Sequence, residues 1–243
     1  MNNTLAYTSS LWFDQSLRSA IEELTLDHQD DTGFFIYNLD ALAKHLAHLQ
    51  TQDVVKLWFA VKANPLSRII QTLAAAGFNF DVASTGELQQ VLAQGVSAQH
   101  ILNTGPAKSK RQIAHFLKLG VQTFVAESIN QLIWLNEAAI ELEQKPTVLL
   151  RVQLQWPDGE KNPLGGNQLT PFGLSPQEWQ HINLADFTGL DVAGLHIFQW
   201  GNMLSNEKMY SLWQQMVPEL INLAESLAMD FRIVDLGGGL GID

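Results

Sequence analysis

Short runs of β-forming residues alternate with longer segments of helical periodicity, and this order limits the chain to a parallel α/β fold. The seven expected strands cover residues 54–63, 78–84, 101–105, 123–126, 147–154, 190–198 and 231–236. Expected helices between them include residues 66–76, 85–93 and 110–119. Several strand runs are almost continuously apolar, as expected when both faces of a parallel sheet are covered. A (β/α)₈ TIM-type barrel and a doubly wound sheet both satisfy this order.

Composition narrows the partners and the chemistry. Lys and Arg number 14 against 25 Asp and Glu, a net charge of −11, so we expect neither nucleic acid nor an anionic membrane as a partner. The sequence has no cysteine, which excludes disulfides and thiolate nucleophiles. The histidines show no metal-ligand spacing, and no metal site is expected. Without a secretory signal or a long apolar segment, the expected location is the cytoplasm.

Polar residues stand at the carboxyl ends of the expected strands, where (β/α) barrels place their working side chains. In chain order these residues are Lys62, Asn64, Asp81, Ser84, Asn103, Glu127, Arg151, His196 and residues 237–239. Each one alone also suits an ordinary turn or a local ion pair. Their joint occurrence predicts a site on one rim of the sheet, the edge at which the carboxyl ends of the strands lie.

Lys62 ends the apolar run Leu-Trp-Phe-Ala-Val at 57–61. Burial there disfavours the ammonium form, which makes a lysine a better nucleophile toward carbonyl groups and a natural Schiff-base former. A lysine that extends to the rim of the sheet fits the same position. Spacing alone leaves both interpretations open.

A glycine-rich run follows the last expected strand, with Gly237, Gly238, Gly239 and Gly241 within five residues. Glycines let the backbone approach an anion and present N–H groups to a phosphate. The run fits neither a Walker sequence nor Gly-x-Gly-x-x-Gly. A Schiff-base lysine and a phosphate loop on one rim together suggest pyridoxal 5′-phosphate.

Six motifs in order carry a resemblance to a known family. They are residues 34–42, Phe-Ala-Val-Lys-Ala-Asn at 59–64, Phe-Asp-Val-Ala-Ser-Thr-Gly-Glu-Leu at 80–88, Asn-Thr-Gly-Pro-Ala-Lys at 103–108, Leu-Arg-Val at 150–152, and Val-Asp-Leu-Gly-Gly-Gly-Leu-Gly at 234–241. The chain resembles the fold-type III pyridoxal-phosphate-dependent decarboxylases, which act on diaminopimelate, ornithine and arginine and share their barrel with alanine racemase. The resemblance implies a (β/α)₈ barrel and an amino-acid decarboxylase.

The resemblance also assigns roles. It implies that Lys62 holds the cofactor as a Schiff base and that Gly237, Gly238 and Gly239 bind its phosphate. It implies that Asp81 and Glu87 order the lysine end of the site. Arg151 matches the family arginine on the fifth strand, where a guanidinium favours ionised acceptors on the cofactor or an ordering network.

The sixth strand departs from the family pattern, because the chain reads Gly-Leu-His-Ile-Phe-Gln-Trp-Gly-Asn at 194–202. His196 matches the first family histidine, and Phe198 takes the position of the histidine that stacks on the cofactor ring. Gly201 replaces a phosphate-binding serine, so a backbone N–H or Asn202 has to supply that donor. This stretch of sequence resembles that of the family branch that serves siderophore and other secondary biosynthesis.

The family continues beyond the glycine loop with an eighth strand and a β-domain, and this sequence ends at Asp243. We therefore expect a fragment, with residues 1–30 as a segment that belongs to the β-domain in the family and residues 31–243 as an incomplete barrel of seven strands. The full-length protein is expected to be a homodimer.

Three alternatives remain open from the sequence. A pyridoxal-phosphate-dependent racemase needs much the same barrel, and the residues that distinguish it lie on the missing segment. A non-catalytic pyridoxal-phosphate-binding protein matches the length but not the motifs. A barrel that keeps the motifs without the cofactor is disfavoured by the presence of Lys62.

Overall fold

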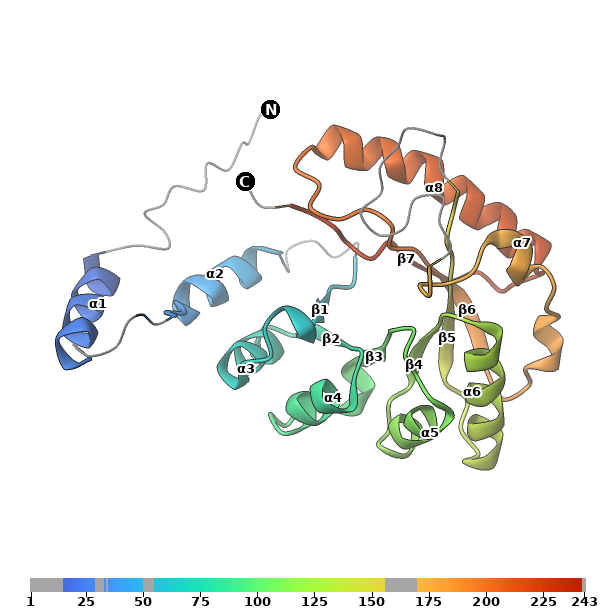
Figure 1. The fold of residues 1–243 in the computed structure, drawn as a ribbon, viewed down its shortest axis with the longest axis horizontal. Helices are drawn as coiled ribbons and strands as arrows, with labels where there is room; N and C mark the ends of the chain where they lie inside the picture. Colours follow the sequence, from blue (N-terminus) through green and yellow to red (C-terminus); the bar gives the residue numbers. More distant parts are fainter. Residues whose placement is uncertain (1–14, 29–32, 34, 50–54, 156–169, 242–243) are drawn as a thin grey trace.

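Seven parallel strands form one curled sheet in the order β1-β2-β3-β4-β5-β6-β7 (Figure 1). The structure is a computed structural model that describes residues 15–28, 33, 35–49, 55–155 and 170–241. Each strand pairs in parallel with the next one along the chain. The sheet curves as one part of a (β/α) barrel, which confirms the predicted fold class and excludes the doubly wound alternative.

All strands except β4, which has its predicted bounds, are shorter than the sequence predicts. The strands are β1 (Trp58–Ala60), β2 (Asn79–Val82), β3 (Ile101–Asn103), β4 (Thr123–Ala126), β5 (Thr147–Arg151), β6 (Asp191–His196) and β7 (Ile233–Asp235). The predicted first strand, 54–63, is too long: residue 54 lies outside the described residues, residues 55–57 are not part of the strand, and a 3₁₀ turn, Val61–Ala63, replaces the last three. Strand number, order and type are confirmed.

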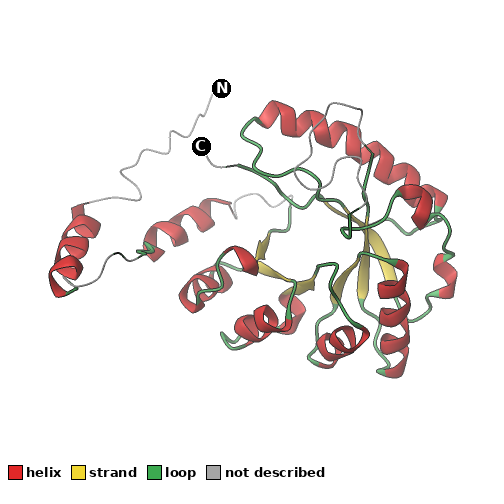
Figure 2. Ribbon diagram, viewed as in Figure 1, coloured by secondary structure: helices red, strands yellow, loops and turns green. Residues whose placement is uncertain are grey.

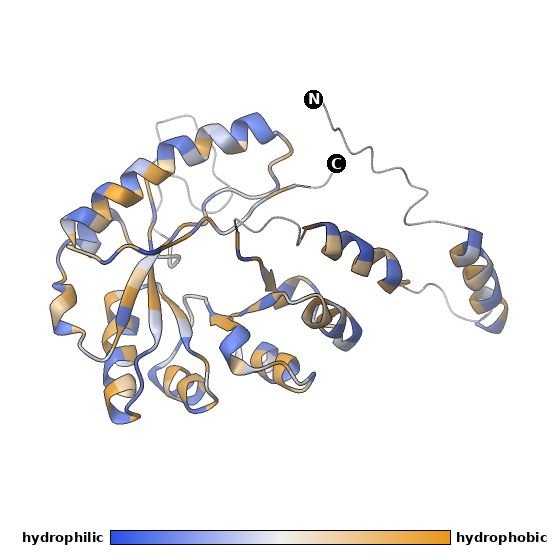
Figure 3. Cartoon of the chain, turned by 180° about the vertical axis from the view of Figure 1, so that it is seen from behind, coloured by the Kyte–Doolittle hydropathy of each residue, from blue (hydrophilic) through white to orange (hydrophobic). Residues whose placement is uncertain are grey.

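Helices cover the convex side of the sheet (Figure 2). The α-helices of the described residues are α1 (Gln15–Asp27), which lies apart from the sheet, α2 (Leu39–Leu49), α3 (Ser67–Ala75), α4 (Thr85–Leu92), α5 (Lys110–Lys118), α6 (Ile129–Glu141), α7 (Pro176–Trp179) and α8 (Asn206–Ser226). Figure 3 shows hydrophilic and hydrophobic residues on each outer helix, as amphipathic helices require. Their apolar sides build the main core with one face of the strands, around buried Phe80, Phe116 and Phe124.

A second, smaller core lies on the other face of the strands. It contains buried Leu102, Val125 and Leu149, with Trp58 packed against them. Successive side chains of a strand point to opposite faces, so residues two positions away from these lie on the same concave face. This face leads directly to the carboxyl ends of the strands and positions the site.

The two N-terminal helices differ in how they relate to the barrel. Residues 15–27 form helix α1, which has no buried residue and lies apart from the sheet in Figure 1. Helix α2 instead packs against α3 through Ala41 and Leu46. The division at residue 30 stays a prediction, and residues 1–14 and 29–32 lie outside the described residues. No described helix combines the length and apolar character needed to cross a membrane.

Candidate active site

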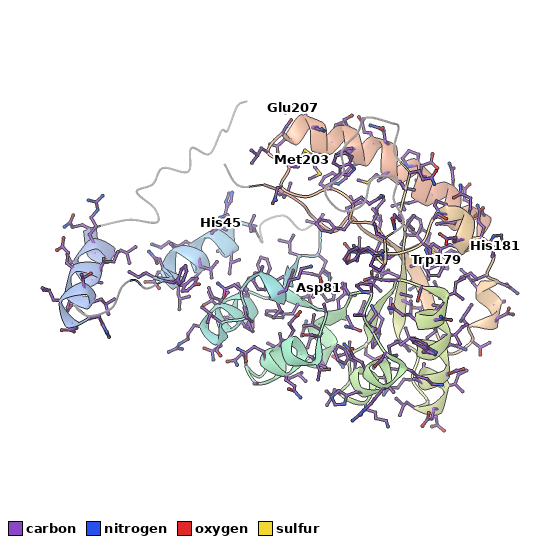
Figure 4. All side chains as sticks on the ribbon, in the orientation of Figure 1. His45, Asp81, Trp179, His181, Met203 and Glu207 are labelled. Atoms are coloured by element: carbon purple, nitrogen blue, oxygen red, sulfur yellow. The ribbon has the colours of Figure 1, made fainter. Side chains whose placement is uncertain are left out.

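Alternation along the strands gathers charged side chains on the concave face. Arg151 lies two residues after Leu149 on β5, and Glu127 lies two residues after Val125 at the end of β4. Asp81 occupies β2 between Phe80 and Val82, both of which belong to the main core on the opposite face. Figure 4 shows Asp81 on the side of the sheet away from helices α3 and α4. The rim predicted from strand ends is therefore an actual surface of the barrel.

One row of this rim crosses three strands. Arg151 of β5 is in register with His196 of β6, and His196 is in register with Asp235 of β7. His196 is buried, and its Nδ1 atom has no hydrogen-bond partner among the described residues. Burial, opposed by Asp235 and reinforced by Arg151 and Lys108, lowers the pKa of His196 to about 4. The imidazole is neutral at pH 7 and retains one unused hydrogen-bonding nitrogen.

A buried ion pair joins β5 to β4. Arg151 Nη1 lies 3.0 Å from Glu127 Oε2, and the side chains expose 9% and 0% of their surface. Glu127 Oε1 accepts a hydrogen bond of 2.6 Å from the backbone N–H of Gly105. Gly173, at φ +91°, leaves room beside Arg151, because a Cβ there would lie 2.6 Å from the Arg151 carbonyl oxygen. Both charges of the pair are therefore held in fixed positions away from water.

Asp81 of β2 is an acid on which the charge of Lys62 acts. It accepts a hydrogen bond of 2.5 Å from Thr104 Oγ1. Burial raises the pKa of Asp81 to about 6, Asp235 adds to this, and Thr104, Lys62 and Lys108 oppose it. Asp81 of β2 and Asp235 of β7 thus interact across the interior of the barrel. Such a shifted acid beside a lysine is typical of functional sites.

Of the two interpretations left open for Lys62, the structure shows the lysine that extends to the rim. Lys62 is exposed and lies in the 3₁₀ turn Val61–Ala63, not in a strand. The reason is that β1 ends at Ala60 and, among the described strands, pairs only with β2. Its charge still acts on Asp81, so the structure does place Lys62 at the rim.

Glu87 has a helix-capping role in the structure. Its carboxylate accepts hydrogen bonds from the Ala83 N–H at 2.9 Å and from the Ser84 hydroxyl at 3.1 Å. Ser84 in turn accepts a hydrogen bond from the Glu87 N–H and caps α4. These contacts fix the β2–α4 turn directly after Asp81. A direct catalytic role for Glu87 stays a prediction.

Three consecutive glycines turn the chain after β7. Gly237, Gly238 and Gly239 have φ values of +70°, +89° and +89°, a region that favours glycine. A Cβ on Gly239 would lie 2.2 Å from the Trp200 carbonyl oxygen, whereas a Cβ on Gly238 would meet nothing within 4 Å. The loop therefore packs closely on one side and has open space at its centre.

The loop after β6 lies against this glycine turn. Met203 N–H donates to the Gly239 carbonyl at 3.0 Å, and Gly241 N–H donates to the Met203 carbonyl at 2.9 Å. Half-buried Phe198 packs on Gly237, whose Cβ would lie 2.5 Å from the Phe198 Cβ. Gly201 and exposed Asn202 (φ +54°) belong to the same loop. The predicted cofactor-binding residues of the two loops are thus brought together.

Sequence reasoning placed Glu127 at the rim without giving it a role, and it missed Lys108 and Asp235. Asp235 carries the same signal as the predicted residues, because it stands at the carboxyl end of β7. Lys108 lies five residues after β3 and carries no such signal. Only its burial and its contact with β4 reveal it.

The described residues fit a phosphate-bearing aldehyde cofactor. The glycine turn offers open space and backbone conformations suited to an anion. The Nδ1 atom of His196 is a buried polar atom that awaits a partner. Phe198 supplies an aromatic face, and Lys62 supplies an amine at the same rim.

The opposite pKa shifts of Asp81 and His196 predict a measurable pH dependence. The pKa of Asp81 is about 6 in the folded protein and 3.8 in the unfolded chain, so the folded state binds this proton more tightly. The stability that the bound proton contributes is therefore lost as the pH rises through about 6. Relative to wild type, Asp81→Asn should therefore gain about 2 kcal/mol of unfolding free energy between pH 4 and pH 7. Urea unfolding at several pH values measures the difference.

His196→Gln is the companion variant, and its expected difference has the opposite sign. Folded His196 remains neutral down to about pH 4, whereas the ordinary value is 6.5, so wild type loses this stability on acidification and the variant does not. A difference between Asp81→Asn and wild type that stays constant with pH would contradict the burial of Asp81.

The fold and the rim define a (β/α)-barrel protein with its site at the carboxyl ends of the strands. Residues 39–243 match the family described as "Pyridoxal-dependent decarboxylase, pyridoxal binding domain". The match covers most of the chain, and the chain belongs to this family. The cofactor of the domain is accordingly pyridoxal 5′-phosphate.

Individual relatives agree with this assignment. The chain is 29% identical to diaminopimelate decarboxylase of Zymomonas mobilis over 76% of this chain and 44% of the relative. It is 27% identical to 2-[(L-alanin-3-ylcarbamoyl)methyl]-2-hydroxybutanedioate decarboxylase of Staphylococcus aureus over 86% and 53%. Diaminopimelate decarboxylase from Helicobacter pylori complexed with L-lysine superposes with a TM-score of 0.78 at 26% identity, over 91% of this chain and 57% of that one. The chain spans about half the length of the curated relatives it matches.

Proposed function

We propose that the protein containing this chain is a pyridoxal-phosphate-dependent decarboxylase of an amino acid or amino-acid derivative, with Lys62 as the residue that forms a Schiff base with the cofactor. The observation that carries this proposal is the rim itself. It combines an amine at β1, a glycine turn after β7 and a buried polar row between them. The relatives reported above are decarboxylases, which favours this reaction over racemisation and over binding without turnover.

Each residue has a task in the proposed site. The cofactor, when bound, supplies an aldehyde that condenses with amines and a ring that accepts the electron pair left when CO₂ departs. Residues 237–239 would hold its phosphate through backbone N–H groups, of which that of Gly237 donates to Asp235 Oδ1 at 2.8 Å in this structure, and Phe198 would pack on its ring. His196 Nδ1 binds a polar atom of the cofactor or substrate. Asp81, ionised above about pH 6, lies where it favours a cation at Lys62.

The charges of the rim bear on the kind of substrate it accepts. Arg151 is already paired with Glu127, so its charge is largely neutralised, whereas the charges of Lys62 and Lys108 both act on Asp81. A substrate with at least one free amine and at least one carboxylate suits this balance. Diaminopimelate and an amino-acid derivative, as in the named relatives, are both candidates, and a place in siderophore or other secondary biosynthesis remains the finer prediction.

Borohydride trapping tests the proposal. The full chain is incubated with pyridoxal 5′-phosphate, reduced, digested and mapped by mass spectrometry. We expect the pyridoxyl group on Lys62, because borohydride reduces a Schiff base to a stable secondary amine. Lys62→Arg, which keeps the charge without forming this bond readily, should lose the label.

Lys56→Arg is the matched control, because Lys56 also lies near β1 but packs its ammonium group 4.9 Å from the Trp58 ring. This variant should keep the label on Lys62. Label distributed equally among exposed lysines, in a folded protein, would overturn the assignment of Lys62. Release of CO₂ from a panel of amino acids by the full-length protein then identifies the substrate.

A further inference from the structure

Lys108 is a buried lysine that no motif role explains. Only 5% of its surface is exposed, and its Nζ donates a hydrogen bond of 2.6 Å to the Val125 carbonyl of β4. The next lysine, Lys110, is exposed and paired with Glu137. A buried ammonium group is costly unless it is paired and hydrogen-bonded, so the surroundings of Lys108 have to compensate it.

Two acids of the rim offset the cost of burying the Lys108 charge. Glu127 at the end of β4 and Asp81 of β2 attract the Lys108 charge, while Arg151 of β5 opposes it. Lys108 also acts on His196 of β6. Burial outweighs the attraction and lowers the pKa of Lys108 to about 8, so the group still carries its charge at pH 7.

The loop that bears Lys108 is fastened on both sides. Thr104 donates to Asp81 on β2, and Gly105 N–H donates to Glu127 at the end of β4. Gln131 of α6 donates a hydrogen bond of 2.8 Å to the Pro106 carbonyl. With the contact of Lys108 to Val125, residues 104–108 connect the Asp81 side of the rim to the Glu127–Arg151 pair.

We propose that Lys108 is a positioning residue of this site: its ammonium group is the shared counterion that fastens residues 104–108 to β4 and couples Asp81 to Glu127. Lys108 touches neither substrate nor cofactor in this role. It stabilises the ionised form of Asp81, the acid that faces Lys62. The inference rests on the proposed function for its catalytic meaning, but the coupling itself is a property of the folded chain.

Carboxyl and amine NMR titrations test the coupling without any cofactor. In Lys108→Met, labelled with ¹³C at aspartate side chains, the Asp81 midpoint should rise from about 6 by roughly 0.5–1 pH unit, because an attracting charge is lost. Lys108→Arg keeps the charge and should restore most of the shift. Lys110→Met removes an exposed lysine and should leave the Asp81 midpoint unchanged.

The reciprocal titration keeps the test decisive if Lys108→Met does not fold. In Asp81→Asn, labelled with ¹³C at lysine side chains, the midpoint of Lys108 should fall below about 8, because coupling between two sites acts equally on both. An Asp81 midpoint that is unchanged in folded Lys108→Met, or a Lys108 midpoint that is unchanged in Asp81→Asn, overturns the proposal. Borohydride labelling of Lys62 is scored separately, so failure of the proposed function remains distinguishable.

Discussion

Replacing Arg151 by methionine should lower the free energy of unfolding by about 3–5 kcal/mol, because it leaves the fully buried carboxylate of Glu127 without its cation. The side chain of Glu127 exposes 0% of its surface, so water cannot replace the guanidinium. Methionine keeps much of the apolar stem of arginine, which limits the effect of lost packing. Chemical denaturation at pH 7 measures the change.

Two further variants separate the charge from the packing. Glu127→Gln combined with Arg151→Met removes both charges and keeps an oxygen that accepts from the Gly105 N–H, so the double variant should be more stable than Arg151→Met alone. Arg232→Met applies the same substitution to an exposed ion pair with Asp191, where a much smaller loss is expected. Equal losses in Arg151→Met and Arg232→Met would show that the buried pair has no special importance.

Strand order and the location of the rim were predictable because they depend on local patterns. Apolar runs fix the strands, and parallel strands place their carboxyl ends together, so Asp81, Arg151 and His196 could be assigned to one rim from the sequence. The same logic fails at β1. Whether Lys62 is buried depends on what lies beside that strand, which no local pattern records. The sequence therefore left a buried and an exposed lysine both open, and the structure shows Lys62 exposed.

The polar network of the rim could be predicted only in part, since hydrogen-bond partners arise from tertiary packing. The capping contacts of Glu87 follow a short-range pattern, Ser84 followed by Glu87 three residues later, and the sequence contained that signal. The contact of Lys108 with Val125 joins a loop to a neighbouring strand across 17 residues. Nothing within the loop itself indicates that its lysine is buried.

The structure connects the site's two halves through different means. Charges join β2, β4 and β5 through Asp81, Lys108, Glu127 and Arg151, whereas backbone hydrogen bonds join the loop after β6 to the glycine turn after β7. Side-chain substitutions should therefore affect the first half most. The second half depends on backbone conformation and tolerates added atoms least.

Gly239→Ala should be the most damaging substitution in that second half. Its φ of +89° costs an alanine about 1–2 kcal/mol. Its Cβ would also lie 2.2 Å from the Trp200 carbonyl oxygen, and forcing the two loops apart should add about 1–3 kcal/mol. The displaced loop would lose the hydrogen bond from Met203 N–H, and the affinity for pyridoxal 5′-phosphate should fall with the stability.

Gly238→Ala is the matched control, because Gly238 has the same φ of +89° but its Cβ would meet no atom within 4 Å. The difference in unfolding free energy between the two variants therefore isolates the contact with Trp200. Gly238→Ala should keep most of the stability yet still weaken cofactor binding, since its methyl group enters the space offered to the phosphate. Fluorescence titration with pyridoxal 5′-phosphate measures this affinity. Wild-type affinity in Gly238→Ala would place the phosphate elsewhere, and equal stability of the two variants would contradict the close packing of the loops.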